Sequence, residues 1–254
     1  MLSFREHAPH PRLAPHVKCF WTLRGHAEGA PPERILPDGS FELVFHLADP
    51  FVRDAAVQPA AMWMGELRRP VLVQPSRNVD VLGVRFRIGG AAAFLRMPLR
   101  EVADAILPIS ELFPELASRV HEARGTAERI AAIEAALLRR MRGDGALVQA
   151  AVRAIDGRDG DLRICGLASA LGTTERSLER AFFAQVGIGP KGLARLIRFH
   201  AALRGRDGGY FDDAHRIREF RDFSGLTPTE FRREQHAIHD AFVGNLQDSG
   251  AAEA

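Results

Sequence analysis

Short apolar runs typical of strands, one of them alternating with a period of two, lie between residues 41 and 88 of this chain, and apolar residues recur with a helical period in most of the chain after that. Residues 41–47 alternate large apolar side chains with Glu42, Val44 and His46, directly after a Pro-Asp-Gly turn that contains Asp38. This pattern predicts a strand with Glu42 and His46 on its solvent-exposed face. Further short strands are predicted at 61–67, 70–75 and 79–88. Such a series of strands indicates a small sandwich or half-open barrel.

A strong amphipathic helix is predicted at 127–142 and another at 147–155, with Gly-Asp-Gly at 143–145 between them. We take that break as the boundary between two domains. The predicted fold class is therefore α+β, with a β-rich, cupin-like N-terminal domain followed by an all-α domain. The predicted division is a β-rich sensory or dimerisation domain at 1–125, a linking helix at 126–145, a helical domain at 146–240 and a disordered tail at 241–254.

Residues 164–195 contain two short amphipathic segments joined by a turn at Gly172. Thr174 is a suitable N-cap for the second segment, whose buried stripe includes Leu178 and Phe182. The opposite, solvent-exposed face carries Arg176, Glu179 and Arg180. Two short helices around a tight turn, with arginines facing outward from the second, are typical of a DNA-reading helix-turn-helix.

A repeat with an offset of 38 positions supports this interpretation. The offset aligns Arg180 with Arg218, Phe182 with Phe220, Gly187 with Gly225, Pro190 with Pro228, Leu193 with Phe231, and the cap Thr174 with Asp212. A tandem of this kind predicts two recognition helices that enter the major groove about 34 Å apart.

At these residues the sequence resembles the AraC/XylS family of bacterial transcription regulators. ERSLERAFFAQVGIGPKGLARLIRF and HRIREFRDFSGLTPTEFR both look like the signature of that family, in the expected order. The resemblance implies recognition helices at Thr174–Val186 and Asp212–Phe223, joined by a long helix at Pro190–Leu203. It places the base-contacting residues at Arg176, Glu179 and Arg180 in the first unit and at Asp213, His215 and Arg218 in the second.

The N-terminal stretches ILPDGSFELVFHL and GVRFRIGGAAAFL are similar to a small cupin-like domain that often precedes this DNA-binding module. The resemblance implies sequence-specific binding of promoter or operator DNA, with no enzymatic activity, cofactor or metal. It also implies a small-molecule effector, with RNA polymerase and a second copy of the chain as further partners. Met62, Trp63 and Met64 are candidates for an effector pocket, although such residues more often belong to a core.

The second unit departs from the family pattern. Between Leu203 and Asp212 the chain has only RGRDGGYF, whereas a support helix with its turn needs roughly a dozen residues. Arg216 stands where the repeat requires the counterpart of the core residue Leu178. The second unit is therefore predicted to be truncated, and its His215 and Arg218 read bases only if the unit still folds against something.

Several roles remain open for the individual side chains. Arg180 can bond a guanine edge, clamp a phosphate or remain a solvated helix residue, and Glu179 can accept from cytosine or pair with its arginine neighbours. Arg176 and Lys191 are expected to position the module on phosphates. Residues 146–240 contain 15 basic and 13 acidic residues, so local arginine placement, rather than a strong field, must provide affinity for DNA.

Composition narrows the class of protein. A hydrophobic content of 46% and a charged content of 26% are typical of a globular protein, and the sequence has no run that could span a membrane and no signal-peptide core. We therefore expect a cytoplasmic protein. Cys19 and Cys165 are too few for a disulfide framework, and Cys165 is expected to be buried. Two alternatives remain: a ligand-binding or interaction module that has lost independent DNA binding, and a cupin-type metalloenzyme.

Overall fold

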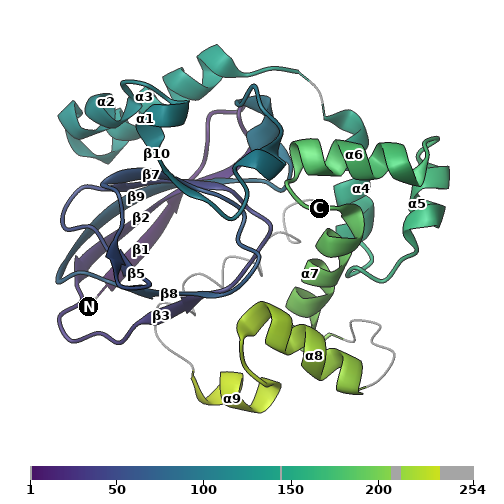
Figure 1. Cartoon of the computed structure of the whole chain (residues 1–254). Helices are drawn as coiled ribbons and strands as arrows, with labels where there is room; N and C mark the ends of the chain where they lie inside the picture. The colour runs from purple at the N-terminus through teal and green to yellow at the C-terminus, as the bar shows by residue number, and fades with distance from the viewer. Residues whose placement is uncertain (1, 144, 207–212, 235–254) are drawn as a thin grey trace.

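The computed structural model describes residues 2–143, 145–206 and 213–234. Its N-terminal half contains two antiparallel sheets, one above the other in Figure 1. The larger has the order β1 (Leu2–His7), β2 (Val17–His26), β9 (Asn78–Phe86), β4 (Glu42–His46), β7 (Ala61–Met64) and β10 (Ile106–Pro108). The smaller has the order β3 (Glu33–Ile35), β8 (Val71–Gln74), β5 (Val52–Arg53) and β6 (Ala56–Val57).

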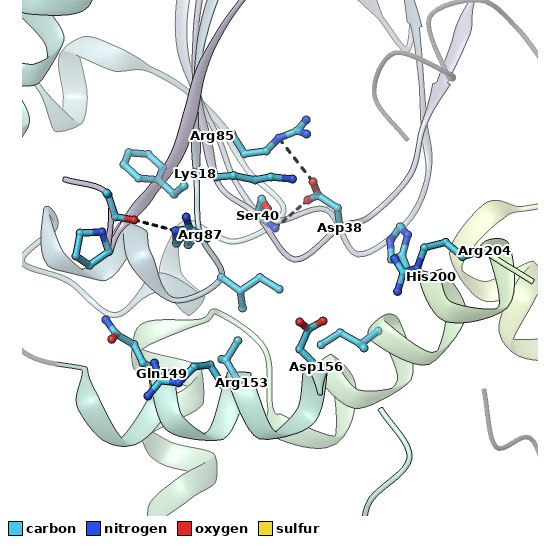
Figure 2. Close-up of a pocket in the computed structure, with 16 residues that line it drawn as sticks. Lys18, Asp38, Ser40, Arg85, Arg87, Gln149, Arg153, Asp156, His200 and Arg204 are labelled. Atoms are coloured by element: carbon cyan, nitrogen blue, oxygen red, sulfur yellow. Dashed lines mark hydrogen bonds and ion pairs between the residues drawn. The ribbon is translucent and has the colours of Figure 1, made fainter. Parts of the chain in front are cut away.

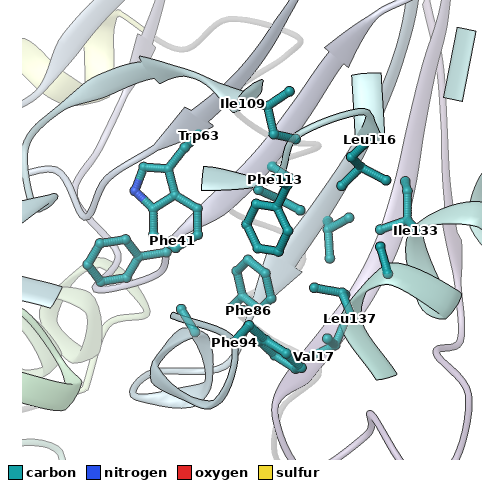
Figure 3. Packing of buried hydrophobic residues seen from close by; sticks show 14 of the residues in the cluster. Val17, Phe41, Trp63, Phe86, Phe94, Ile109, Phe113, Leu116, Ile133 and Leu137 are labelled. Atoms are coloured by element: carbon teal, nitrogen blue, oxygen red, sulfur yellow. The ribbon is translucent and has the colours of Figure 1, made fainter. Parts of the chain in front are cut away.

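Helical segments cover the outer face of the larger sheet (Figure 1). They are η1 (Gly90–Ala93), η2 (Leu99–Glu101), α1 (Ile109–Leu112), α2 (Leu116–Glu122) and α3 (Gly125–Arg140). Figure 3 shows how Ile133 and Leu137 of α3 pack towards aromatic side chains from the sheet and the loops around it, among them Trp63, Phe86 and Phe113. Trp63 is fully buried in this core, so it does not line an effector pocket.

The prediction that Glu42 and His46 lie on a solvent-exposed face of strand β4 is wrong. Glu42 is 3% exposed and His46 is 2% exposed, because β4 lies in the middle of the six-stranded sheet and both of its faces are covered. One face packs on the helices, and the other, which carries Glu42 and His46, faces the space between the two sheets. There His46 pairs with Gln58 at 3.1 Å, and burial lowers the pKa of His46 to about 4, which keeps the ring neutral.

Glu66, which follows β7, is a second buried carboxyl group and gives a prediction about stability. Burial raises its pKa to about 8, partly opposed by Arg68. Because the folded protein then holds a proton that the unfolded chain releases, the free energy of unfolding falls as the pH rises from 4.5 towards 8. Urea unfolding measures the free energy of unfolding of Glu66→Gln and of the wild type at pH 5.5 and pH 8.5. We expect the difference between the two proteins to shift by about 2–3 kcal/mol in favour of the variant at the higher pH. An equal effect at both pH values would contradict the burial of an ionisable carboxyl group.

The C-terminal half is helical. It comprises α4 (Ala146–Asp156), α5 (Ile164–Ala170), α6 (Glu175–Gln185), α7 (Pro190–Leu203), α8 (Asp213–Ser224) and α9 (Pro228–Arg233). The α+β fold class predicted from the sequence is confirmed, and α7 has the predicted bounds. The predicted cap at Asp212 and the predicted tail at 241–254 lie outside the described residues. No helix in the described ranges is both long and apolar enough to cross a membrane.

The repeat seen in the sequence is also a repeat in the structure. Gly187 and Gly225 follow the ends of α6 and α8 with φ values of +90° and +73°, a conformation that glycine adopts without steric cost. Pro190 and Pro228 begin α7 and α9, and Phe182 and Phe220 are both buried. In each repeat, a glycine therefore follows one helix and a proline starts the next.

Candidate functional site

The turn between α5 and α6 has the local chemistry that the sequence predicts. Gly172 has a φ of +66°, and the Oγ1 atom of Thr174 accepts a hydrogen bond from the backbone N–H of Ser177 at 3.2 Å. Leu178 and Phe182 of α6 are fully buried and pack with Leu167 of α5. This apolar contact fixes α6 on its support helix. Cys165, on the other side of α5, is exposed, so the expectation that it is buried is wrong.

The opposite face of α6 carries an array of charged side chains. Arg176, Glu179 and Arg180 are all exposed, within the first two turns of the helix. Within the described part of the chain, none of the three takes part in an ion pair. The suggestion that Glu179 merely pairs with its arginine neighbours therefore finds no support. Two guanidinium groups and a carboxylate on one free helix face can bond base edges and phosphates.

The remaining predicted site residues are spread over two helices. Lys191 is exposed in the first turn of α7. Arg218 of α8 is exposed, and its Nε atom donates to the carbonyl of Ala214 at 3.3 Å. Asp213 and His215 lie in the first turn of α8, and the structure does not describe the exposure of their side chains. The structure thus brings together the three residues of α6 and places the second-unit residues on a separate helix.

The C-terminal end of α6 rests on the N-terminal domain. A Cβ atom added to Gly187 would lie 3.2 Å from Cζ of Phe41 and 3.3 Å from Cβ of Ala103. A Cβ atom added to Gly89 would be 3.8 Å from Val186. Arg176 and Arg180 are the second and sixth of the eleven residues of α6, whereas this contact lies at and beyond its C-terminal end. The N-terminal domain therefore anchors α6 without covering its charged face.

A segment of the N-terminal domain completes the core of the second unit, which has only nine residues, 204–212, between α7 and α8. Leu36, which follows strand β3, is 8% exposed and packs in one cluster with Phe199, Phe220 and Phe231. Phe199 and Phe220 meet edge to face with their ring centroids 5.1 Å apart. Arg216, in contrast, is exposed, as its mismatch in the repeat suggests. Leu36 thus supplies part of the core that a support helix would otherwise provide.

Polar contacts hold the same segment to the second unit. Arg34 donates from Nε and Nη2 to the two carboxylate oxygens of Glu234 at 3.1 and 3.0 Å, and from Nη1 to the carbonyl of Ser224 at 3.3 Å. Nε2 of His200 on α7 donates to the carbonyl of Pro37 at 2.7 Å. We call residues 34–37 the docking segment. A bidentate arginine–carboxylate pair fixes the relative orientation of the two segments that it joins, in addition to strengthening their contact.

A cavity of about 520 Å³ lies between the N-terminal sheet and helices α4 and α7, and we call it the interdomain pocket (Figure 2). Lys18, Asp38 and Arg85 line it from the sheet side, and Arg153 and Asp156 face them from α4. Arg85 is buried and bonds Glu42, its cross-strand partner, at 2.6 Å. Oδ1 of Asp38 accepts from the backbone N–H of Ser40 at 2.8 Å, which confirms the role of Asp38 in the turn.

Sequence reasoning did not find the docking segment or the interdomain pocket. Leu36 meets Phe199 across more than 160 positions, and no local pattern reports such a contact. The only sequence signal was indirect: the missing support helix left the second unit with exposed apolar surface that another segment had to cover.

The chain is similar to one family model and to several solved structures. Residues 5–108 match a family model described as a domain of unknown function (DUF6597). No curated protein matches the chain. Crystal structures of ToxT from Vibrio cholerae are similar to it. For ToxT of strain O395 bound to (E)-4-(8-methylnaphthalen-1-yl)but-3-enoic acid, the identity is 9%, the TM-score is 0.44, and the match covers 91% of this chain and 97% of that chain. For unsaturated fatty acid bound ToxT of strain SCE256, the values are 11%, 0.42, 91% and 94%.

Proposed function

We propose that this protein is a cytoplasmic transcription regulator of the AraC/XylS type that reads a specific DNA site through α6. The observation that carries the proposal is the exposed array of Arg176, Glu179 and Arg180, which form no ion pair among the described residues, on a helix whose other face is fixed by Leu178 and Phe182. A recognition helix needs these two faces, one rigidly packed and one free to enter the major groove. The protein acts by binding and has no enzymatic activity.

In this proposal, the second unit contributes to DNA binding through α8. Two observations support this role. A glycine follows α8 and a proline starts the next helix, as is the case for α6, and Arg218 is exposed on α8. The docking segment holds α8 in place, so the N-terminal domain takes part in setting the spacing of the two recognition helices. RNA polymerase and a second copy of the chain are the further partners expected of such a regulator.

Substitutions on α6 test the assignment of roles. We expect Arg180→Ala to lower the affinity for the specific site by about 5- to 150-fold and to relax the preference at one base pair, since a bidentate guanine contact contributes about 1–3 kcal/mol. Arg176→Ala should instead weaken binding to all sequences and reduce the salt slope by about one. Fluorescence anisotropy with matched and mismatched duplexes at several salt concentrations separates the two effects.

A matched control is Arg139→Ala, which removes an exposed arginine from α3 in the N-terminal domain. It should leave both affinity and base preference unchanged. If Arg180→Ala behaves like Arg139→Ala, then α6 does not read bases. The chain is then better described as a ligand-binding or interaction module, for which the docking of the second unit on the N-terminal domain is the supporting observation.

A further inference from the structure

The interdomain pocket has the size of a small-molecule site. Its volume of about 520 Å³ falls within the roughly 300–1,000 Å³ of cavities that bind metabolites and drug-sized ligands. The cavity between the two sheets, lined by His46, Met62 and Met64, has a volume of only about 60 Å³. That space is too small for a ligand of this kind, so the interdomain pocket is the stronger candidate.

The charged lining of the interdomain pocket is mainly basic. Its charged residues comprise Lys18, Arg85, Arg87, Arg153 and Arg204 on the basic side and Asp38 and Asp156 on the acidic side. Five cations and two carboxylates leave a formal excess of three positive charges. Two carboxylates outside the lining each offset one of these charges: Glu42, which bonds Arg85, and Asp159, which pairs with Arg204. The pocket therefore remains positive in a partly desolvated space.

A bound anion would stabilise two of these cationic side chains, Lys18 and Arg204. Burial lowers the pKa of Lys18, and the nearby charge of Arg85 adds to this effect. Nη2 of Arg204 is 3.8 Å from Asp159, and its Nε atom is buried and has no hydrogen-bond partner among the described residues. A negative group near these side chains would offset the desolvation of the Lys18 ammonium and supply an acceptor close to Arg204.

Apolar side chains form the rest of the wall. Ile88 comes from the N-terminal domain, Val152 from α4 and Ile197 from α7. We propose that the interdomain pocket binds a small organic anion, in which one acidic group is attached to an apolar body. This inference deepens the proposed function, on which it rests, by giving the chemical class of the effector.

An occupant of this pocket would touch the elements that hold the second unit. Asp38 and Ser40 line the pocket and directly follow the docking segment. His200 also lines the pocket, and its Nε2 atom donates to the carbonyl of Pro37. A ligand would therefore contact α7 and the residues that follow the docking segment, which gives it a physical route to the second recognition helix.

The binding test uses the full chain and the fluorescent anion 8-anilinonaphthalene-1-sulfonate, which has an acidic group on an apolar body. We expect one site, with Lys18→Met and Arg153→Ala each weakening binding by about ten-fold or more, since each removes a charge-assisted hydrogen bond to the acidic group. Val152→Trp should remove binding by filling the pocket while leaving the charges in place. Arg139→Ala, on α3, is the matched control, and circular dichroism checks that each variant is folded.

Competition identifies which parts of the ligand are recognised. 4-Phenylbutyrate should displace the dye, whereas its neutral analogue 4-phenylbutanol and inorganic phosphate should displace it at least ten-fold less well, since each lacks one recognised part. Equal displacement by the alcohol or by phosphate would overturn the inference, and so would a dye affinity that the three pocket variants leave unchanged. DNA binding is measured on the same samples. Dye binding without DNA binding contradicts only the proposed function. DNA binding without dye binding contradicts only this inference.

Discussion

Replacing Leu36 with aspartate is expected to release α8 and α9 from the rest of the protein. Leu36 is buried against Phe199, Phe220 and Phe231, and a carboxylate there would be desolvated within an aromatic cluster. The second unit has only a nine-residue connection and no support helix within the described residues to compensate. We expect hydrogen exchange of the α8 amides to accelerate by about 100-fold, whereas α6 keeps its protection, since about 2.8 kcal/mol corresponds to that factor.

The control for this substitution is Val57→Asp, which introduces the same charge at a residue of the smaller sheet that is 69% exposed. It should leave the exchange of α8 unchanged. Arg34→Ala should give an intermediate acceleration, because it removes the bonds to Glu234 and Ser224 but keeps the apolar contact. Unaltered protection of α8 in Leu36→Asp would show that the second unit folds without the docking segment.

Replacing Arg85 with methionine is expected to destabilise the N-terminal domain by about 3–5 kcal/mol, because it leaves the carboxylate of Glu42 buried without its partner. Burial raises the pKa of Glu42, and Arg85 is the main group that opposes this shift. The double variant Arg85→Met/Glu42→Leu should recover most of the loss, since the buried carboxylate is removed together with its partner and Asp38, the other carboxylate paired with Arg85, is partly exposed. Urea unfolding of the wild type, both single variants and the double variant measures the coupling.

The surface pair of Arg119 and Glu115 provides the comparison. Both side chains are more than half exposed, so Arg119→Ala should cost less than about 1 kcal/mol. A similarly small loss for Arg85→Met would mean that solvent reaches Glu42. A double variant that is no more stable than the single variants would mean that the shape of the pair, rather than its charge, stabilises the sheet.

The helical domain was the part that the sequence predicted best, because its signals are local. Thr174 caps α6, Pro190 begins α7 and glycines follow α6 and α8, and each of these signals acts within a few residues. The exposed face of α6 follows from the same periodicity. For this reason the candidate DNA-binding residues of the first unit could be named from the sequence.

The strands and the domain contacts were harder to predict, because they depend on distant parts of the chain. Strand β2 was missed as a strand, since its centre is buried on both faces and shows no alternation. The same double coverage of β4 places Glu42 and His46 inside the protein, although two charged or polar residues on one face of an alternating strand predict an exposed face. The docking segment and the interdomain pocket arise only when the two domains meet.

The titration that tests DNA binding most directly uses a fluorescent duplex selected from a random library by the full chain, compared with a shuffled duplex of equal length. The two are measured at low and physiological salt. We predict that the selected duplex binds at least 100-fold more tightly and that this preference persists at about 150 mM salt, because base contacts do not depend on counterion release. Equal affinity for both duplexes, lost as the salt rises, would show attraction to phosphates alone and would contradict a sequence-reading regulator.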